Sequence, residues 1–144
     1  MKRLLATAIA AMTLSGAAQA EDPARLVTIL TAPEPQTQLM AMVLTMQAAQ
    51  QGTTPHILLC GPAGDLALAD APPSATTGQP PRDMSPQGLM QAIMQQSGAK
   101  VEVCAIYLPG RGEGPEVLLD GVTVAKPGEM AGAITAPDAR VMSF

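Results

Sequence analysis

Two cysteines are the residues of this chain best suited to covalent chemistry. Each belongs to a short apolar run that is typical of a β-strand: Cys60 ends the run that starts at His56, and Cys104 lies in the run from Val101 to Ile106. The thiolate is the reactive form of cysteine, and a nearby cation or helix N-terminus lowers the pKa of a thiol. Since ligands and reactive groups collect at strand ends in α/β sheets, both thiols are candidate site residues.

Cys104 has the clearer surroundings for reactivity. Arg111 lies in the glycine-rich stretch that follows it, and a helical turn near residues 115–120 could direct its N-terminus toward the same strand end, so that both would stabilise a thiolate. The alternative is structural. If the strand runs from Lys100 to Leu108, Cys104 lies in mid-strand on the face of Glu102 and is an inert, buried packing residue.

A disulfide between Cys60 and Cys104 is the third alternative. It would close a loop of 44 residues, for which loss of chain entropy gives roughly 4 kcal/mol of stabilisation at most. A disulfide needs Cα atoms within about 7 Å, whereas neighbouring strands lie about 4.8 Å apart and next-but-one strands about 9.6 Å apart. The bond is therefore feasible if the second and third strands are neighbours, and fails if the first strand lies between them.

The N-terminus has the pattern of an export signal. Lys2 and Arg3 precede an apolar stretch over 4–14, and the small residues at 18–20 form a signal-peptidase site. We expect residues 1–20 to be a signal peptide and residues 21–144 to be a periplasmic protein. The apolar stretch is too short to span a bilayer, which needs roughly 20 residues, so no membrane insertion is expected after cleavage.

Composition excludes several classes of function. After cleavage six Lys and Arg would face twelve Asp and Glu, a net charge of −6, which argues against binding of nucleic acid or anionic lipid. No Gly-x-Ser-x-Gly elbow is present, and the Gly110–Gly114 stretch lacks the Lys-Ser/Thr of a phosphate-binding loop. There is thus no hydrolase, kinase or dehydrogenase signature, and whether the protein is an enzyme stays open.

No cofactor or metal is expected. His56 is the only histidine and has no second ligand nearby in the sequence, which is more typical of a polar strand residue than of a metal ligand. The methionine pairs Met42/Met46 and Met90/Met94 have the i, i+4 spacing of helix packing, which favours core filling over a Cu(I) site.

Strands and helices alternate along the chain. Apolar runs predict strands at 26–31, 55–60, 100–108, 122–125 and 140–144; helical patterns cover 36–51, 85–98 and 127–133, with shorter turns at 65–70 and 116–120. Residues 71–84 are predicted to be a long loop, either a flexible insertion or a lid. This order implies a single three-layer α/β domain with a five-stranded, mostly parallel sheet and helices on both faces. Helix 36–51 is apolar around most of its circumference, so a subunit interface could cover its outer side.

Several of these segments resemble the DsrE/DsrF-like family of small α/β proteins. The similarity is carried by Leu26–Thr31, by Gln38–Met42, by Cys60-Gly61-Pro62-Ala63-Gly64-Asp65-Leu66, by Val101–Cys104, and by the tail from Val122 to Phe144, which looks like exported members. Residues Ala105–Pro109 stand where many members have a glycine-containing loop.

The resemblance implies a function. Several members act in sulfur relay and carry a persulfide on a cysteine at the end of the third strand, the position that Cys104 matches; members are often oligomeric. The favoured hypothesis is an exported sulfur carrier that uses Cys104, with Arg111 stabilising the thiolate, and that has protein partners and forms a homo-oligomer. The alternative is a noncatalytic oligomeric binding or assembly module in which Cys104 is buried and structural.

Overall fold

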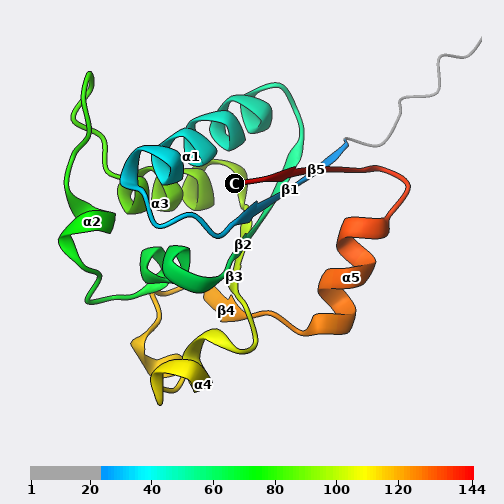
Figure 1. Ribbon diagram of the computed structural model, residues 1–144. Coiled ribbons are helices and arrows are strands. Elements are labelled where there is room, and N and C mark those ends of the chain that lie inside the picture. Colours follow the sequence, from blue (N-terminus) through cyan, green and yellow to red (C-terminus); the bar gives the residue numbers. More distant parts are fainter. Residues whose placement is uncertain (1–23) are drawn as a thin grey trace, which may run out of the picture.

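All five strands of the central sheet run in the same direction. The computed structural model describes residues 24–144, in which the strands pair in the order β4-β3-β2-β1-β5 and all four pairings are parallel (Figure 1). The strands are β1 (Arg25–Leu30), β2 (Thr54–Leu59), β3 (Lys100–Val103), β4 (Val122–Val124) and β5 (Ala139–Ser143). This confirms the predicted five-stranded sheet. The predicted signal peptide, residues 1–20, lies outside the described residues.

Helices cover both faces of the sheet, as predicted. They are α1 (Pro35–Gln50), α2 (Pro73–Thr76), α3 (Pro86–Ser97), α4 (Tyr107–Arg111) and α5 (Pro127–Thr135), with 3₁₀ helices η1 (Gly61–Ala67) and η2 (Pro115–Val117). Helices α1 and α3 pack against each other on one side of the sheet, whereas α5 lies apart from them (Figure 1). Among residues 24–144, no helix has the length and apolar character needed to cross a membrane.

The face under α1 and α3, here called the α1/α3 face, is closely packed and almost wholly apolar. Side chains alternate between the two faces of a strand, and this face receives Leu30, Ile57, Leu59, Val101 and Val103, all with no exposed area. Met42, Met90 and Ile93 contribute the helix side of the same core. Met42 and Met90 are therefore packing residues, which is the role their spacing predicts.

The opposite face, here called the α5 face, is covered much more sparsely. Its buried cluster consists of Val27, Leu58, Ala125 and Met130, and Cys60 and Cys104 pack against it while only partly buried. On the edge strand β5, Val141 remains 48% exposed. One helix of nine residues cannot cover the whole face, so the ends of β2 and β3 stay accessible.

Helix α3 forms where its capping residues predict it. The Ser85 hydroxyl accepts a hydrogen bond from the Gly88 amide at 3.1 Å, Pro86 occupies the first turn, and Gly98 ends the helix with a left-handed φ of 65°. A hydroxyl at this position satisfies one of the amides that have no partner inside the helix, and glycine adopts positive φ without strain.

The third strand is shorter than predicted. It ends at Val103, and residues 107–111 form α4 instead of continuing the strand to Leu108. Its partner β4 has only three residues, so the register stops at the Val103–Val124 pair. Pro109 sits in the first turn of α4, where its missing amide is not required. Cys104 therefore lies just beyond the strand end, and its predicted alternative position in mid-strand was wrong.

The segment predicted as a loop between 71 and 84 contains local structure. Helix α2 forms one turn whose Ala75 is 1% exposed and joins the main core, and an antiparallel bridge pairs Gln79 with Met84. The predicted turns at 65–70 and 116–120 are displaced toward the N-terminus, as η1 and η2. These differences follow from prolines at residues 62, 73 and 115, each of which stands in the first turn of its helix.

Candidate functional site

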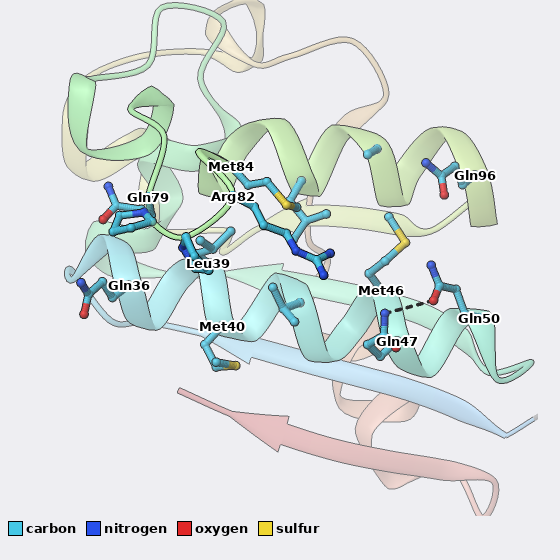
Figure 2. Close-up of a pocket in the computed structure, with 15 residues that line it drawn as sticks. Gln36, Leu39, Met40, Met46, Gln47, Gln50, Gln79, Arg82, Met84 and Gln96 are labelled. Carbon is cyan, nitrogen blue, oxygen red and sulfur yellow. Dashed lines mark hydrogen bonds between the residues drawn. The ribbon is translucent and has the colours of Figure 1, made fainter.

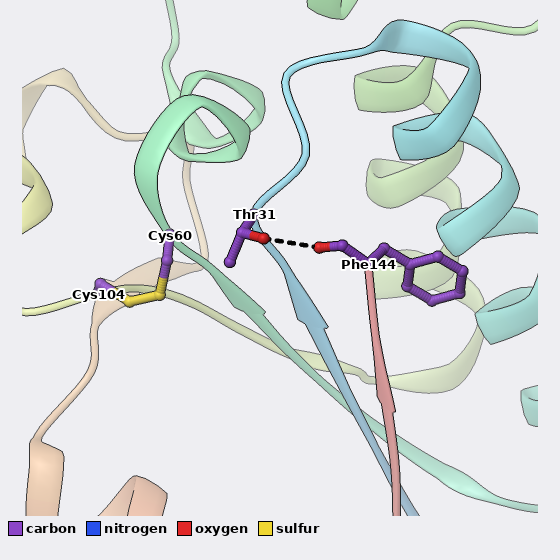
Figure 3. The surroundings of a disulfide bond; sticks show 4 residues. All are labelled: Thr31, Cys60, Cys104 and Phe144. Atoms are coloured by element: carbon purple, nitrogen blue, oxygen red, sulfur yellow. Dashed lines mark hydrogen bonds between the residues drawn. A yellow bond between two sulfur atoms is a disulfide. The ribbon is translucent and has the colours of Figure 1, made fainter.

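Cys60 and Cys104 lie side by side at the carboxyl ends of two neighbouring strands. The last residues of β2 and β3, Leu59 and Val103, are register partners, and each cysteine follows directly. The two Cα atoms are 5.1 Å apart, and a disulfide joins the sulfur atoms (Figure 3). The condition set by the sequence for this bond, that the second and third strands be neighbours, is met.

The sheet holds both cysteines through the backbone. The Cys104 amide donates to the Leu59 carbonyl at 2.8 Å, and the Cys60 amide donates to the Leu30 carbonyl at 2.9 Å. On the far side of Cys60, Thr31 donates a side-chain hydrogen bond to the Phe144 carbonyl at 2.8 Å (Figure 3). The positions of the cysteines are therefore fixed by hydrogen bonds that do not depend on the disulfide.

A second connection joins the segments that leave the two cysteines. Tyr107, three residues after Cys104, donates a hydrogen bond of 2.6 Å to Asp65, which lies in η1 after Cys60. The Tyr107 ring also packs against Gly64 so closely that a Cβ there would overlap the ring. Burial, followed by the hydrogen bond to the Asp65 carboxylate, raises the pKa of the Tyr107 phenol. We call this pair of contacts the Tyr107 clamp.

Arg111 belongs to the same cluster but contacts carboxylates. Its guanidinium donates to Glu113 at 2.6 Å, lies 3.4 Å from Asp65, and sits over the Tyr107 ring at 5.6 Å. The hydrogen bond from Arg111 lowers the pKa of the exposed Glu113 carboxyl. Within residues 24–144 no hydrogen bond joins Arg111 to either cysteine. The structure thus places the predicted thiolate stabiliser in the clamp region, paired with acids.

The α5 face carries a second polar cluster that the sequence analysis did not identify. His56 Nε2 and Glu102 Oε2 are 2.7 Å apart, and both side chains are nearly buried. Lys100 reaches the other Glu102 oxygen at 2.9 Å and extends toward Glu129 of α5. The sequence spacing contains a signal for this cluster, because side chains an even number of residues apart on a strand point to the same face. His56 therefore shares a face with Cys60, and Glu102 shares a face with Cys104.

A groove lies away from both polar clusters. It has a volume of about 930 Å³ and runs between α1, α3 and the 79–84 segment, and Figure 2 shows Leu39, Met46 and Met84 around it. Arg82 is its only charged lining residue; the remainder is apolar or glutamine-rich. This lining suits packing or binding and offers no nucleophile or acid–base pair. Within residues 24–144, no group of three or more His, Cys, Asp or Glu side chains is arranged so that it could hold a metal ion.

Comparison with known proteins identifies the fold. No family model matches the chain, and no curated protein matches it. The YchN protein from E. coli aligns with a TM-score of 0.63 at 19% sequence identity, over 83% of this chain and 99% of YchN. MTH1491 from Methanobacterium thermoautotrophicum, described as a protein of unknown function, aligns with a TM-score of 0.60 at 14% identity, over 84% of this chain and 99% of MTH1491. Both have the DsrE-like fold, and this chain shares it.

Proposed function

We propose that the protein is an exported member of the DsrE/DsrF-like family that carries sulfur as a persulfide on Cys104. The observation that carries this proposal is the position of Cys104, which follows the end of β3 on the accessible part of the α5 face. In the resembling family the sulfur-carrying cysteine occupies the end of the third strand. Export to the periplasm is proposed from residues 1–20, and secretion of a fusion to those residues would test it.

The chemistry needs the reduced protein. The Cys104 thiolate attacks the outer sulfur of a donor persulfide, R–S–SH, so that Cys104–S–SH forms and the donor leaves as the thiolate R–S⁻. The disulfide with Cys60 is then the resting, oxidised state of the same site. Cys60 lies within bonding reach of Cys104, so an oxidant joins the two thiols when the site carries no sulfur.

Mass spectrometry of the reduced protein tests the proposal. The protein is reduced, freed of reductant and treated with glutathione persulfide without oxygen. We expect a gain of about 32 Da, one sulfur atom. Because trypsin cleaves after Arg82 and Lys100, the two cysteines fall in different peptides, and the added sulfur should be found in residues 101–111.

Two serine variants serve as matched controls. Cys60→Ser keeps the proposed acceptor and should still take up sulfur, whereas Cys104→Ser should not. Uptake by Cys104→Ser that equals uptake by Cys60→Ser would show that the transfer has no site preference, and the proposal would fail.

We also propose a homo-oligomer in which α1 contributes to the interface. Met40 is 52% exposed and Leu44 is 42% exposed, and their i, i+4 spacing places them side by side on the outer surface of this helix. Light scattering after size-exclusion chromatography should give a multiple of the monomer mass. Replacing Met40 and Leu44 by Gln should reduce that mass; the exposed Gln47→Ala on the same helix should not.

A noncatalytic binding module is the second candidate, because the cysteines are joined and half-buried in this structure. In that case the disulfide is a covalent staple and the groove beside α1 is the functional surface. The same persulfide experiment distinguishes the two candidates. If the disulfide is only structural, the reduced protein should take up no more sulfur than the Cys104→Ser variant.

A further inference from the structure

We propose that the Cys60–Cys104 disulfide is itself a sulfur-accepting group, which hydrosulfide opens to leave the persulfide on Cys104. This inference rests on the proposed function and adds a substrate class, inorganic sulfide. It also assigns a role to Cys60, which becomes the leaving thiolate. The oxidised, disulfide-bonded form is then the form that reacts with sulfide, and not an inactive state.

The reaction balances without any further oxidant. Hydrosulfide attacks the Cys104 sulfur, a new sulfur–sulfur bond forms, and the Cys60–Cys104 bond breaks: Cys60–S–S–Cys104 + HS⁻ gives Cys104–S–SH + Cys60–S⁻. Sulfide sulfur gives up two electrons when it becomes part of a persulfide, and the disulfide accepts them as its Cys60 sulfur leaves as a thiolate. A proton from water then neutralises the Cys60 thiolate.

The fold keeps the site in place while the bond is open. The backbone hydrogen bonds of Cys60 and Cys104 to β1 and β2 do not involve sulfur. The Tyr107 clamp adds the hydrogen bond to Asp65 and the close packing on Gly64, which tie the segment after Cys104 to the segment after Cys60. An opened pair therefore stays at closing distance, so the bond can form again once the persulfide has been passed on.

The site is accessible to a small nucleophile. Both cysteines are only partly buried, and the chain beyond Cys104 turns outward at Ile106, which is 81% exposed. Hydrosulfide is a single heavy atom and needs no formed pocket, only a path to one sulfur. On the same face, Met130 of α5 belongs to the buried cluster of Val27, Leu58 and Ala125, and the two cysteines lie at the margin of that cluster.

Neighbouring side chains favour attack at Cys104. A nucleophile approaches a disulfide sulfur in line, from the side away from the sulfur that leaves. For Cys104 that side holds Ala125, which directly follows β4 and whose side chain is a single methyl. For Cys60 it holds Thr31, which is branched and hydrogen-bonded to Phe144 (Figure 3). The smaller obstacle lies beside Cys104.

Sulfide added to the disulfide-bonded protein tests the inference. One equivalent of sodium sulfide is added to oxidised, reductant-free protein under anaerobic conditions, and free sulfur groups are then alkylated. We expect a gain of about 34 Da before alkylation, the mass of hydrogen sulfide. The extra sulfur should lie in peptide 101–111, and an ordinary alkylated thiol should appear on Cys60. The same protein reduced beforehand is the matched control and should gain no sulfur, since it has no disulfide to accept the two electrons that sulfide must give up.

Each other outcome overturns the inference. An unchanged disulfide shows that the bond is closed to sulfide, and sulfur on Cys60 shows that the acceptor is the wrong cysteine. The glutathione persulfide experiment distinguishes failure of this inference from failure of the proposed function. If reduced Cys104 takes up persulfide sulfur but the disulfide does not react with sulfide, the carrier function stands and only the sulfide reaction is ruled out.

Discussion

The two faces of the sheet differ in what they contain and in how they are covered. The α1/α3 face consists mainly of buried aliphatic side chains, beneath two helices that pack on each other. The α5 face carries the only histidine, a buried glutamate and both cysteines, and one short helix covers part of it. The first face therefore supplies stability, and the second has the groups that can do chemistry.

The comparison shows how a small parallel sheet can serve both purposes. Alternation along β2 sends Ile57 and Leu59 to one face and His56, Leu58 and Cys60 to the other. Because β2 and β3 each contribute to both faces, the positions of Cys60 and Cys104 are set by the packing of the aliphatic side.

Ile57→Ala should cause the greatest loss of stability. Ile57 is fully buried on the α1/α3 face, and truncating such a side chain leaves a cavity that costs about 4 kcal/mol. The matched change on the α5 face, Val141→Ala on the exposed edge strand, should cost less than about 0.5 kcal/mol. Urea unfolding of both variants gives the two values, and equal losses would contradict the division between the faces.

Reduction of the disulfide should have the next largest effect, a loss of about 3 kcal/mol in the free energy of unfolding. The chain-entropy ceiling for a loop of 44 residues is about 4 kcal/mol, and the α1/α3 core remains intact. The protein should therefore stay folded when reduced. Circular dichroism during urea titration with and without reductant measures the difference, and the Cys60→Ser/Cys104→Ser variant should not respond to reductant. If reduction alone unfolded the protein, the disulfide would be a structural bond that the fold requires.

Glu102→Ala should cost about 2 kcal/mol, because His56 and Lys100 lose their partner at a nearly buried position. Glu102→Gln keeps a hydrogen-bond acceptor for His56 and should lose less. Thermal unfolding of both variants tests this. If Glu102→Ala and Glu102→Gln lower the unfolding temperature equally, the hydrogen bond to His56 contributes nothing to stability.

Tyr107→Phe should have the smallest effect at neutral pH, about 1 kcal/mol, through loss of one hydrogen bond to Asp65. The pH dependence is more specific. Burial raises the pKa of Tyr107, so above its unfolded pKa of about 10 the folded protein holds a proton that the unfolded chain has released. This stabilisation is complete below pH 10 and is lost as the pH rises further.

Tyr107 is the only tyrosine and the chain has no tryptophan, so the ultraviolet absorbance of phenolate reports this one group. The wild-type protein should lose stability above about pH 10, whereas Tyr107→Phe should lose less. A midpoint for the folded protein at the ordinary tyrosine value would show that the clamp does not form.

The sequence was sufficient to predict the sheet and its main helices, because their signals are local. The Ser85 and Pro86 pair marks the start of α3, and the largely apolar runs at 26–31 and 55–60 fall within a residue of β1 and β2. The end of the third strand was not predicted, since Ala105, Ile106 and Tyr107 continue the apolar pattern. Both neighbouring strands end at the level of Val103, β2 at Leu59 and β4 at Val124, and this is a tertiary property that the local pattern does not contain.

The candidate site was predicted in part. The sequence identified Cys104 and allowed for a disulfide to Cys60. Whether the disulfide could form depended on whether the second and third strands are neighbours, which no local sequence pattern contains. The partners of Arg111 depend in the same way on where η1 places Asp65. The His56–Glu102 pair joins residues 46 positions apart, so it could be found only once β2 and β3 were known to be neighbours.

Sulfur transfer at Cys104 requires one property above all: the bond between Cys60 and Cys104 must open while the fold persists. Its reduction potential, measured by equilibration with glutathione buffers and alkylation of free thiols, tests this directly. A site that exchanges sulfur should have a potential above about −300 mV, in the range of catalytic pairs. A potential well below about −300 mV is typical of structural disulfides, and would contradict a reactive role for Cys104.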